Sequence, residues 1–120
     1  MFVKVSPASL IDDKELEELG IIPRCIAKSK RGSDLAVPCK LQYLGFSQEN
    51  GKTRITLSDG TNFILVAVLE MYSVIFTKGK VTPNQLLNLM NLAQRGGELT
   101  LMAFRVIPGS LNKLGSPSPL

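Results

Sequence analysis

The segment 52–69 restricts the possible folds of this chain more than any other, because two strand-like runs flank a single tight turn. The turn is Ser58-Asp59-Gly60, in which the Asp side chain can bond its own backbone and Gly tolerates a positive φ. In the first run polar and apolar residues alternate, and Lys52 and Arg54 lie on the polar face. The pattern predicts a β-hairpin with one face toward a core and one basic face toward solvent. We interpret this basic face as a recognition surface.

The length of 120 residues is that of one domain, and the hydrophobic content of 44% supports an ordered core. No apolar run reaches the roughly 18–20 residues that a membrane span needs. The start, MFVKVSPASL, lacks the long apolar stretch of a secretory signal. We therefore expect a soluble intracellular domain that does not contact a membrane.

The residue types argue against catalysis. Histidine is absent, which removes the commonest general base and the usual zinc ligand. Cys25 and Cys39 are the only cysteines and cannot complete a four-ligand zinc site, so we expect reduced, unpaired thiols. The sequence has no phosphate-binding glycine loop and no nucleophile motif. We expect no enzymatic activity, no metal and no cofactor.

Charge is distributed unevenly along the chain. Residues 1–19 carry two lysines and five acidic residues, a net charge of −3. Residues 20–120 carry twelve basic and five acidic residues, a net charge of +7. A basic body suits phosphate groups or acidic peptides as ligands.

Gly, Pro and capping residues divide the remaining chain into short elements. A helix is expected over 9–19, with Ser9 or Asp12 as N-cap and Gly20 after its last turn. Two segments stay open between helix and strand, 70–78 and 85–94. The others are predicted as an extended segment over 21–27, a loop over 28–34, a strand over 39–46, a turn over 48–51, strands over 62–69 and 98–107, and a linker after residue 108.

Five strand-like segments with a helical break between the third and fourth predict a mainly β protein with an OB-fold. This is a partly open Greek-key barrel that binds ligands on its face and in its loops. We expect one OB-fold domain over 1–108, with 1–37 as an N-terminal extension, followed by a flexible linker over 109–120.

The order and spacing of five segments over residues 38–107 resemble a known family. It is the N-terminal protein-interaction domain of the large subunit of eukaryotic replication protein A, whereas residues 1–37 do not match it. The resemblance implies a strand over 85–94 and a helical turn over 70–78. The matching segments are LQYLGF (41–46), TRITLSDGTN (53–62), LVAVLEM (65–71), QLLNLMNLAQ (85–94) and LTLMAFRVI (99–107).

That family's domain is a nuclear recruitment module of a DNA replication and repair factor. Its basic groove binds acidic, amphipathic helical segments of checkpoint and repair proteins, and it binds single-stranded DNA weakly. The resemblance implies the same ligands here, with other subunits of the complex bound through the rest of the chain. Helix-in-groove recognition needs an apolar floor and cations at the rim.

The resemblance places Lys52, Arg54 and Arg95 at basic groove positions. Ser47 and Gly96 stand roughly where the family has two further arginines, a loss that Arg105 and Lys40 could compensate. Asn88 is a candidate polar contact, as is Asn91. The candidate floor residues, for which plain core packing stays equally open, are Val66, Leu87, Leu89 and Met90.

Two alternatives remain. One is an OB-fold whose main ligand is single-stranded nucleic acid, for which Tyr43, Phe46 and Tyr72 are the available stacking platforms. The other is a purely structural or assembly module, for which the sequence offers no positive feature. We also hypothesise that the acidic helix 10–19 occupies the basic groove of its own chain or of another copy.

Overall fold

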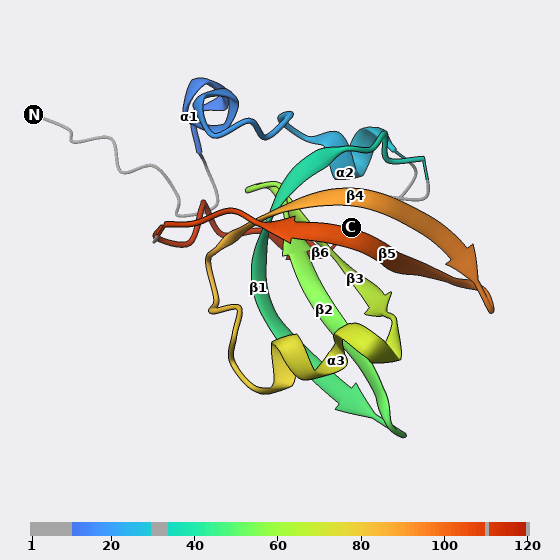
Figure 1. The fold of residues 1–120 in the computed structure, drawn as a ribbon. Coiled ribbons are helices and arrows are strands. Elements are labelled where there is room, and N and C mark those ends of the chain that lie inside the picture. Colours follow the sequence, from blue (N-terminus) through green and yellow to red (C-terminus); the bar gives the residue numbers. More distant parts are fainter. Residues whose placement is uncertain (1–10, 30–33, 110, 120) are drawn as a thin grey trace, which may run out of the picture.

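The computed structural model describes residues 11–29, 34–109 and 111–119. Within them the chain forms a small β-barrel with short helices at its ends (Figure 1). The elements are α1 (Asp13–Glu18), α2 (Cys25–Lys28), β1 (Cys39–Glu49), β2 (Lys52–Ser58), β3 (Asn62–Val68), α3 (Glu70–Thr77), β4 (Leu86–Arg95), β5 (Glu98–Val106) and β6 (Ser118–Pro119).

Strand pairing closes the barrel. β1 pairs antiparallel with both β2 and β4, β2 pairs antiparallel with β3, and β4 with β5. The parallel pairing of β3 with β5, at Ala67 opposite Thr100 and Val68 opposite Leu101, completes the circle. A closed five-stranded mixed barrel with a helix between β3 and β4 confirms the predicted OB-fold class.

The two ambiguous segments follow the resemblance: 86–94 lies in the strand β4, directly after Gln85, and 70–77 forms the helix α3. In β4 the side chains of Leu87 and Leu89 are fully buried, while Asn88 between them is half-buried and points outward. The alternation of side chains, which predicts a strand, therefore describes this segment better than its composition, which is typical of a helix. A strand here buries leucines on the inner side of a closed barrel.

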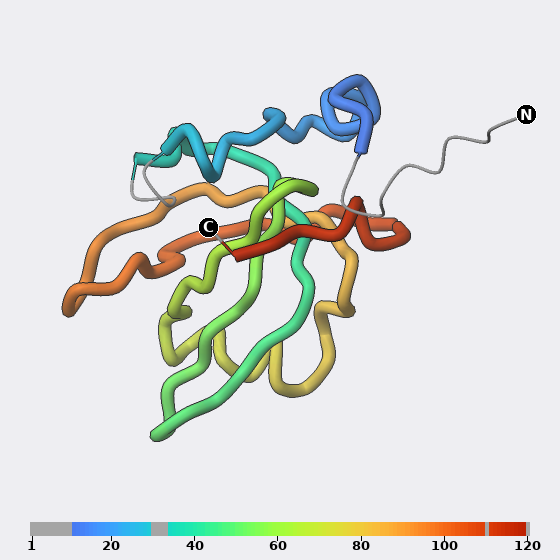
Figure 2. Tube along the Cα trace, turned by 180° about the vertical axis from the view of Figure 1, so that it is seen from behind, coloured from blue at the N-terminus to red at the C-terminus, as the bar shows by residue number. Residues whose placement is uncertain are grey.

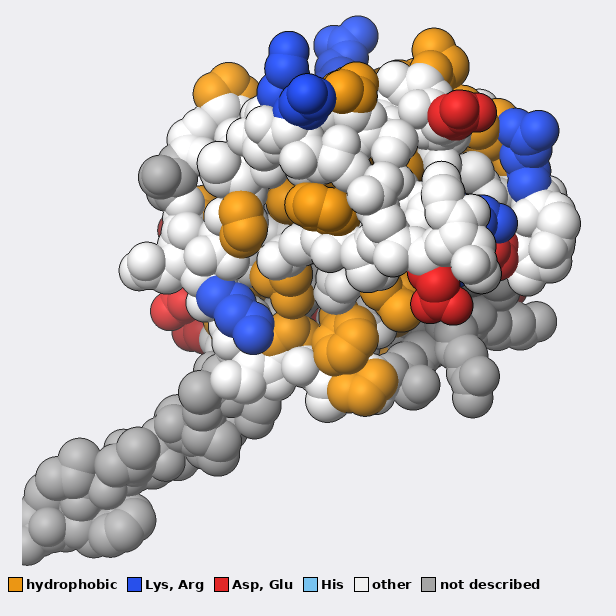
Figure 3. All heavy atoms as spheres, turned by 90° about the horizontal axis from the view of Figure 1, so that it is seen from below, with side chains coloured by type: hydrophobic (Ala, Val, Ile, Leu, Met, Phe, Trp, Pro, Cys, Tyr) orange, Lys and Arg blue, Asp and Glu red, His pale blue; other side chains and the backbone are white. Residues whose placement is uncertain are grey.

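Aromatic packing closes the end of the barrel beneath which α3 lies in Figure 1. Phe76 of α3 is fully buried, with its ring centroid 5.2 Å from that of Tyr43 and 5.4 Å from that of Phe104. The other face of α3 exposes Met71 (70%) and Val74 (49%). Hydrophobic side chains are visible on this end of the molecule in Figure 3.

Tight turns join β1 to β2 and β4 to β5. Asn50 and Gly51 have φ values of 54° and 77°, and Gly96 and Gly97 have 59° and 81°. Positive φ at both central residues is the type I′ geometry that matches the twist of paired strands, and it favours Asn-Gly and Gly-Gly. The first turn is shorter than predicted, because β1 continues through Glu49.

The predicted Ser58-Asp59-Gly60 turn is present, and the Asp59 side chain is fully buried. Its Oδ1 accepts hydrogen bonds from the backbone N–H groups of Thr61 (2.9 Å) and Asn62 (2.8 Å). Its Oδ2 accepts a third, from the N–H of Ile26 at 3.0 Å. One carboxylate therefore both shapes the turn and fastens α2 to the barrel.

Residues 12–19 agree with the predicted helix, since Asp12 caps α1 through a bond from the Lys14 N–H. Residues 9 and 10 lie outside the described residues. The extended segment predicted over 21–27 is wrong at its C-terminal half, where α2 begins at Cys25. The bond from the Ile26 N–H to Asp59, 33 residues away, holds this helical turn and has no local signature.

The C-terminal segment also differs from expectation. The sequence predicted a flexible linker over 109–120, yet residues 111–119 lie against the barrel, and β6 pairs with the start of β3 (Figure 2). Leu111 and Leu114 pack on a second hydrophobic cluster formed by Leu16, Ile21 and Leu86.

Gln42 holds this segment in place. Its side chain is fully buried, and its Nε2 donates to the carbonyl oxygens of Asn84 and Asn112, both at 2.9 Å. Its Oε1 accepts from the N–H of Leu114, also at 2.9 Å. Every hydrogen-bonding position of the buried amide except one lone pair is thus used.

We predict that Asp59→Ala lowers the free energy of unfolding by about 2–4 kcal/mol, because it removes the acceptor from one buried and two partly buried N–H groups. Asp59→Asn keeps an acceptor for the turn but turns an N–H donor toward Ile26 or toward the turn amides. Asp59→Asn should lower the free energy of unfolding by less than Asp59→Ala does. It should also reduce the protection of the turn amides and of the Ile26 amide from hydrogen exchange. Urea unfolding and hydrogen exchange measure both effects. Equal stability of Asp59→Ala and the wild type would contradict this account.

We predict that Gln42→Met releases the C-terminal segment while the barrel stays folded. Methionine fills a similar volume but cannot bond to Asn84, Asn112 or Leu114. Amide exchange at Leu114 and Ser118 should accelerate by tenfold or more, with little change at Val66. Unchanged protection at Leu114 would show that packing of the leucines alone holds the segment.

Candidate functional site

A groove lies between the β1–β2 hairpin, the junction of β3 with α3, and the β4–β5 hairpin. It consists of two adjoining pockets of about 340 and 250 Å³, which share Lys52, Val68 and Glu70. In the pocket of about 340 Å³ the floor is apolar and is formed by Ala67, Val68 and Leu69. The other pocket is lined mostly by polar residues, and the exposed Glu70 lines both. We call this space the groove.

The groove has a cation on each side. Lys52 stands at the start of β2, and Arg95 stands at the end of β4 across the floor. Arg95 is exposed and makes no ion pair with any described residue. Each cation stands directly beside a two-residue hairpin turn, in the last residue pair of its hairpin. The pairing of the strands therefore sets where Lys52 and Arg95 lie.

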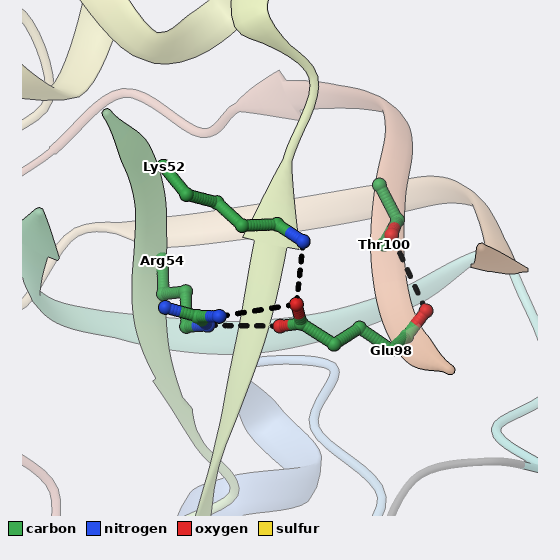
Figure 4. Close-up of polar contacts among 4 residues, drawn as sticks. All are labelled: Lys52, Arg54, Glu98 and Thr100. Atoms are coloured by element: carbon green, nitrogen blue, oxygen red, sulfur yellow. Dashed lines mark hydrogen bonds and ion pairs between the residues drawn. The ribbon is translucent and has the colours of Figure 1, made fainter. Parts of the chain in front are cut away.

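Beside the groove, Glu98 binds two of the predicted cations (Figure 4). Its Oε1 lies 2.5 Å from Lys52 Nζ and 3.1 Å from an Arg54 Nη, and its Oε2 lies 2.8 Å from Arg54 Nε. The paired guanidinium bonds form a bidentate, charge-assisted contact. We call these three residues the Glu98 cluster.

The Glu98 cluster spans β3 from β2 to β5. In the strand register Arg54 of β2 lies opposite Ala67 of β3, and Ala67 lies opposite Thr100 of β5. Arg54, Ala67 and Thr100 therefore form a row across three strands. Ala67 faces the outside of the barrel but is only 1% exposed. Its small side chain leaves room for the long side chains of Arg54 and Glu98 to meet above it.

The cluster shifts the pKa of Glu98 and that of Arg54. Hydrogen bonds from Arg54 and Lys52 lower the pKa of Glu98 to about 2, well below the ordinary 4.5. The pKa of Arg54 is raised by its bond to Glu98. The Glu98 carboxylate is therefore ionised at neutral pH and stays ionised in mild acid.

Of the other predicted site residues, some lie at the groove or beside the Glu98 cluster, and others lie on a different part of the barrel. Ser47 lies next to the cluster, exposed and opposite Arg54 in the β1–β2 register, and Gly96 lines the groove. Asn88 and Arg105 form a separate row with Lys40 across β4, β5 and β1. Arg105 is seven residues from Glu98 in β5, about 23 Å along the strand, so it does not join the groove.

Three predicted floor residues need correction. Val66, Leu87 and Leu89 have 0% exposed surface and belong to the barrel core. The predicted alternation holds from Leu86 to Leu89, and irregularities after Leu89 shift the register, so that Leu92 packs against the same core. Alternation also does not tell which side of a strand faces inward in a closed barrel. The actual floor is supplied by Ala67 and by Val68 and Leu69 at the end of β3.

The hypothesis that the acidic helix 10–19 fills the groove of its own chain is also corrected. Residue 10 lies outside the described residues, and α1 lies near the Ser58–Gly60 end of β2, where Ile11 and Leu16 approach Gly60. Lys52 begins the same strand at its other end. The acidic group that pairs with the predicted cations is Glu98, which the sequence did not identify because its partners lie 44 and 46 residues away.

Most of the aromatic side chains predicted to stack on nucleic-acid bases are not exposed enough to do so. Tyr43 is 1% exposed, and Tyr72 is half-buried and makes a T-shaped ring contact with Phe104. Phe46 alone among these candidates is largely exposed, at 44%.

Cys25 and Cys39 are buried, free thiols, as predicted for reduced and unpaired cysteines. Burial raises the pKa of Cys25 to about 12 and that of Cys39 to about 11, so both free thiols are protonated at neutral pH. The described residues contain no group of three or more potential metal ligands. They also contain no helix of the length and apolarity required to cross a bilayer.

We predict that Glu98 titrates with a pKa near 2 in the folded domain and that Arg54→Gln moves its pKa toward 4.5. A lowered pKa means that the cluster stabilises the fold above pH 4.5 and that this contribution disappears as the pH falls toward 2. The side-chain carboxyl carbon of Glu98, followed by NMR, reports its titration. A wild-type pKa near 4.5 would show that the cluster does not persist in solution.

Comparison with known proteins yields no family model and no curated protein that matches this sequence. The fold itself is an OB-type barrel, an architecture compatible with nucleic-acid binding or protein interaction.

Proposed function

We propose that this domain is a protein-recruitment module that binds acidic, amphipathic segments of partner proteins in the groove. The observation that carries the proposal is the apolar floor of Ala67, Val68 and Leu69 between Lys52 and Arg95. An amphipathic helix can place its apolar side chains on such a floor and its carboxylates beside the cations at the rim.

The surface next to the groove supports the same ligand chemistry. Leu65 lies two residues before Ala67 on the outer side of β3 and is 56% exposed. An amphipathic ligand that extends along β3 would therefore meet a second apolar contact. The charged contacts are exposed, so each should contribute only about 0.2–1 kcal/mol, and they should mainly accelerate association.

The family resemblance supports a more specific version of the proposal. In that version the domain belongs to a nuclear single-stranded-DNA-binding factor of replication and repair, and its partners are checkpoint and repair proteins. Weak binding of single-stranded DNA would accompany this role, and other subunits would bind through the rest of the chain. Ser47 and Gly96, which replace family arginines, make this groove less basic and reduce its dependence on strongly acidic ligands.

Single-stranded nucleic acid as the main ligand is the second candidate. The net charge of +7 over residues 20–120 favours it. The burial of Tyr43 and the packing of Tyr72 against Phe104 argue against it, because base stacking on aromatic side chains supplies much of the affinity in such sites.

We predict that Arg95→Glu weakens binding of an acidic amphipathic peptide roughly two- to tenfold, by replacing an attractive rim contact with a repulsive one. Arg105→Glu makes the same change in charge at the far end of β5 and serves as the matched control. NMR titration at near-physiological salt measures both, with shifts expected at Lys52, Val68 and Arg95.

The same titration with short single-stranded DNA separates the two functions. The recruitment module requires saturable peptide shifts in the groove and weaker DNA shifts. Strong DNA binding around Lys40 and Arg105, with no response to peptide, would overturn the proposal in favour of a nucleic-acid-binding domain.

A further inference from the structure

We propose that Glu98 is an internal competitor for the ligand: it occupies the carboxylate site formed by Lys52 and Arg54, and a bound partner replaces it there with an acidic side chain of its own. This inference rests on the proposed function. It identifies the ligand group that the site accepts and the residue of this chain that opposes its binding.

The geometry defines the site as a carboxylate receptor. Lys52 Nζ, Arg54 Nε and an Arg54 Nη converge on the two oxygens of one carboxylate, at 2.5, 2.8 and 3.1 Å. The Arg54 fork matches the spacing of carboxylate oxygens, and the Lys52 ammonium adds a third donor. A carboxylate from a partner can make the same three contacts without any change in the two cations.

Glu98 is placed so that it can leave. Its side chain is 29% exposed, as are 45% of Lys52 and 30% of Arg54, so solvent and ligands reach the contact. Its backbone is held by pairing with Arg95 in the β4–β5 hairpin. Rotation of the Glu98 side chain alone would free both cations, and the displaced carboxylate would become hydrated.

Replacement of the Glu98 carboxylate by a ligand carboxylate contributes little net binding free energy. Glu98 therefore affects which ligands the groove selects. A ligand with a single acid would replace contacts that the protein already has. A ligand with a second acid near Arg95 and apolar side chains on Val68 and Leu69 gains contacts that Glu98 does not make. The internal carboxylate therefore favours acidic amphipathic partners over simple anions.

The test compares Glu98→Gln with Glu17→Gln, which removes the same charge from the exposed face of α1. Peptide affinity is measured by NMR titration at fixed salt. Glu98→Gln should tighten binding roughly two- to tenfold, since glutamine competes weakly for the two cations, whereas Glu17→Gln should change it less than twofold. Glu98→Asp, whose shorter side chain retains the charge, should also tighten binding and covers the case of poor folding by the first variant.

The Nε–H resonance of Arg54 provides a second readout. In the wild type it should shift when peptide is added, because its acceptor changes from Glu98 to the ligand. Wild-type binding at Arg95 with equal or weaker binding by both Glu98 variants would overturn this inference alone and leave Glu98 as a structural link between β2 and β5. An absence of saturable shifts in the wild type and in both variants at low salt would overturn the proposed function as well.

Discussion

The parallel pairing of β3 with β5 is the constraint on which the rest of the structure depends. It is the step that turns an antiparallel sheet into a closed barrel, and it sets Ala67 directly beside Thr100. Through it, two hairpins formed by distant parts of the chain come to stand on either side of the β3–α3 junction. The groove exists because of this closure, since no single hairpin contains both Lys52 and Arg95.

The ion pairs in the structure reduce the positive charge that is available to a ligand at the groove. The body of the chain is strongly basic, yet two of the cations nearest the groove are already paired with Glu98. A count of charges therefore overstates the positive field that a ligand meets. Arg95 is the groove cation left without an ion pair among the described residues, which makes position 95 the most sensitive to charge reversal.

Local patterns predicted the barrel well. Alternation identified the strands, and Asn50-Gly51 and Gly96-Gly97 marked the hairpins that flank the groove. Patterns with a period of two have no information about which side becomes the interior, so Leu87 and Leu89 could be assigned to core or floor with equal reason.

Contacts between distant residues account for what the sequence did not predict. The helical turn at Cys25 depends on Asp59, the C-terminal segment on Gln42, and the Glu98 cluster on the β3–β5 closure. In each case a polar side chain bonds to a partner more than 30 residues away. An isolated Asp, Gln or Glu in the sequence gives no sign of such a role.

The way in which the C-terminal segment is fastened has a mechanical consequence. A pulling force applied at this end of the chain would first act on the short pairing of β6 with β3, then on the amide of Gln42, and then on Leu114 and Leu111 in the hydrophobic cluster. These attachments are in series, and all precede β5. The segment would thus extend and absorb load one contact at a time before any strand of the barrel separated.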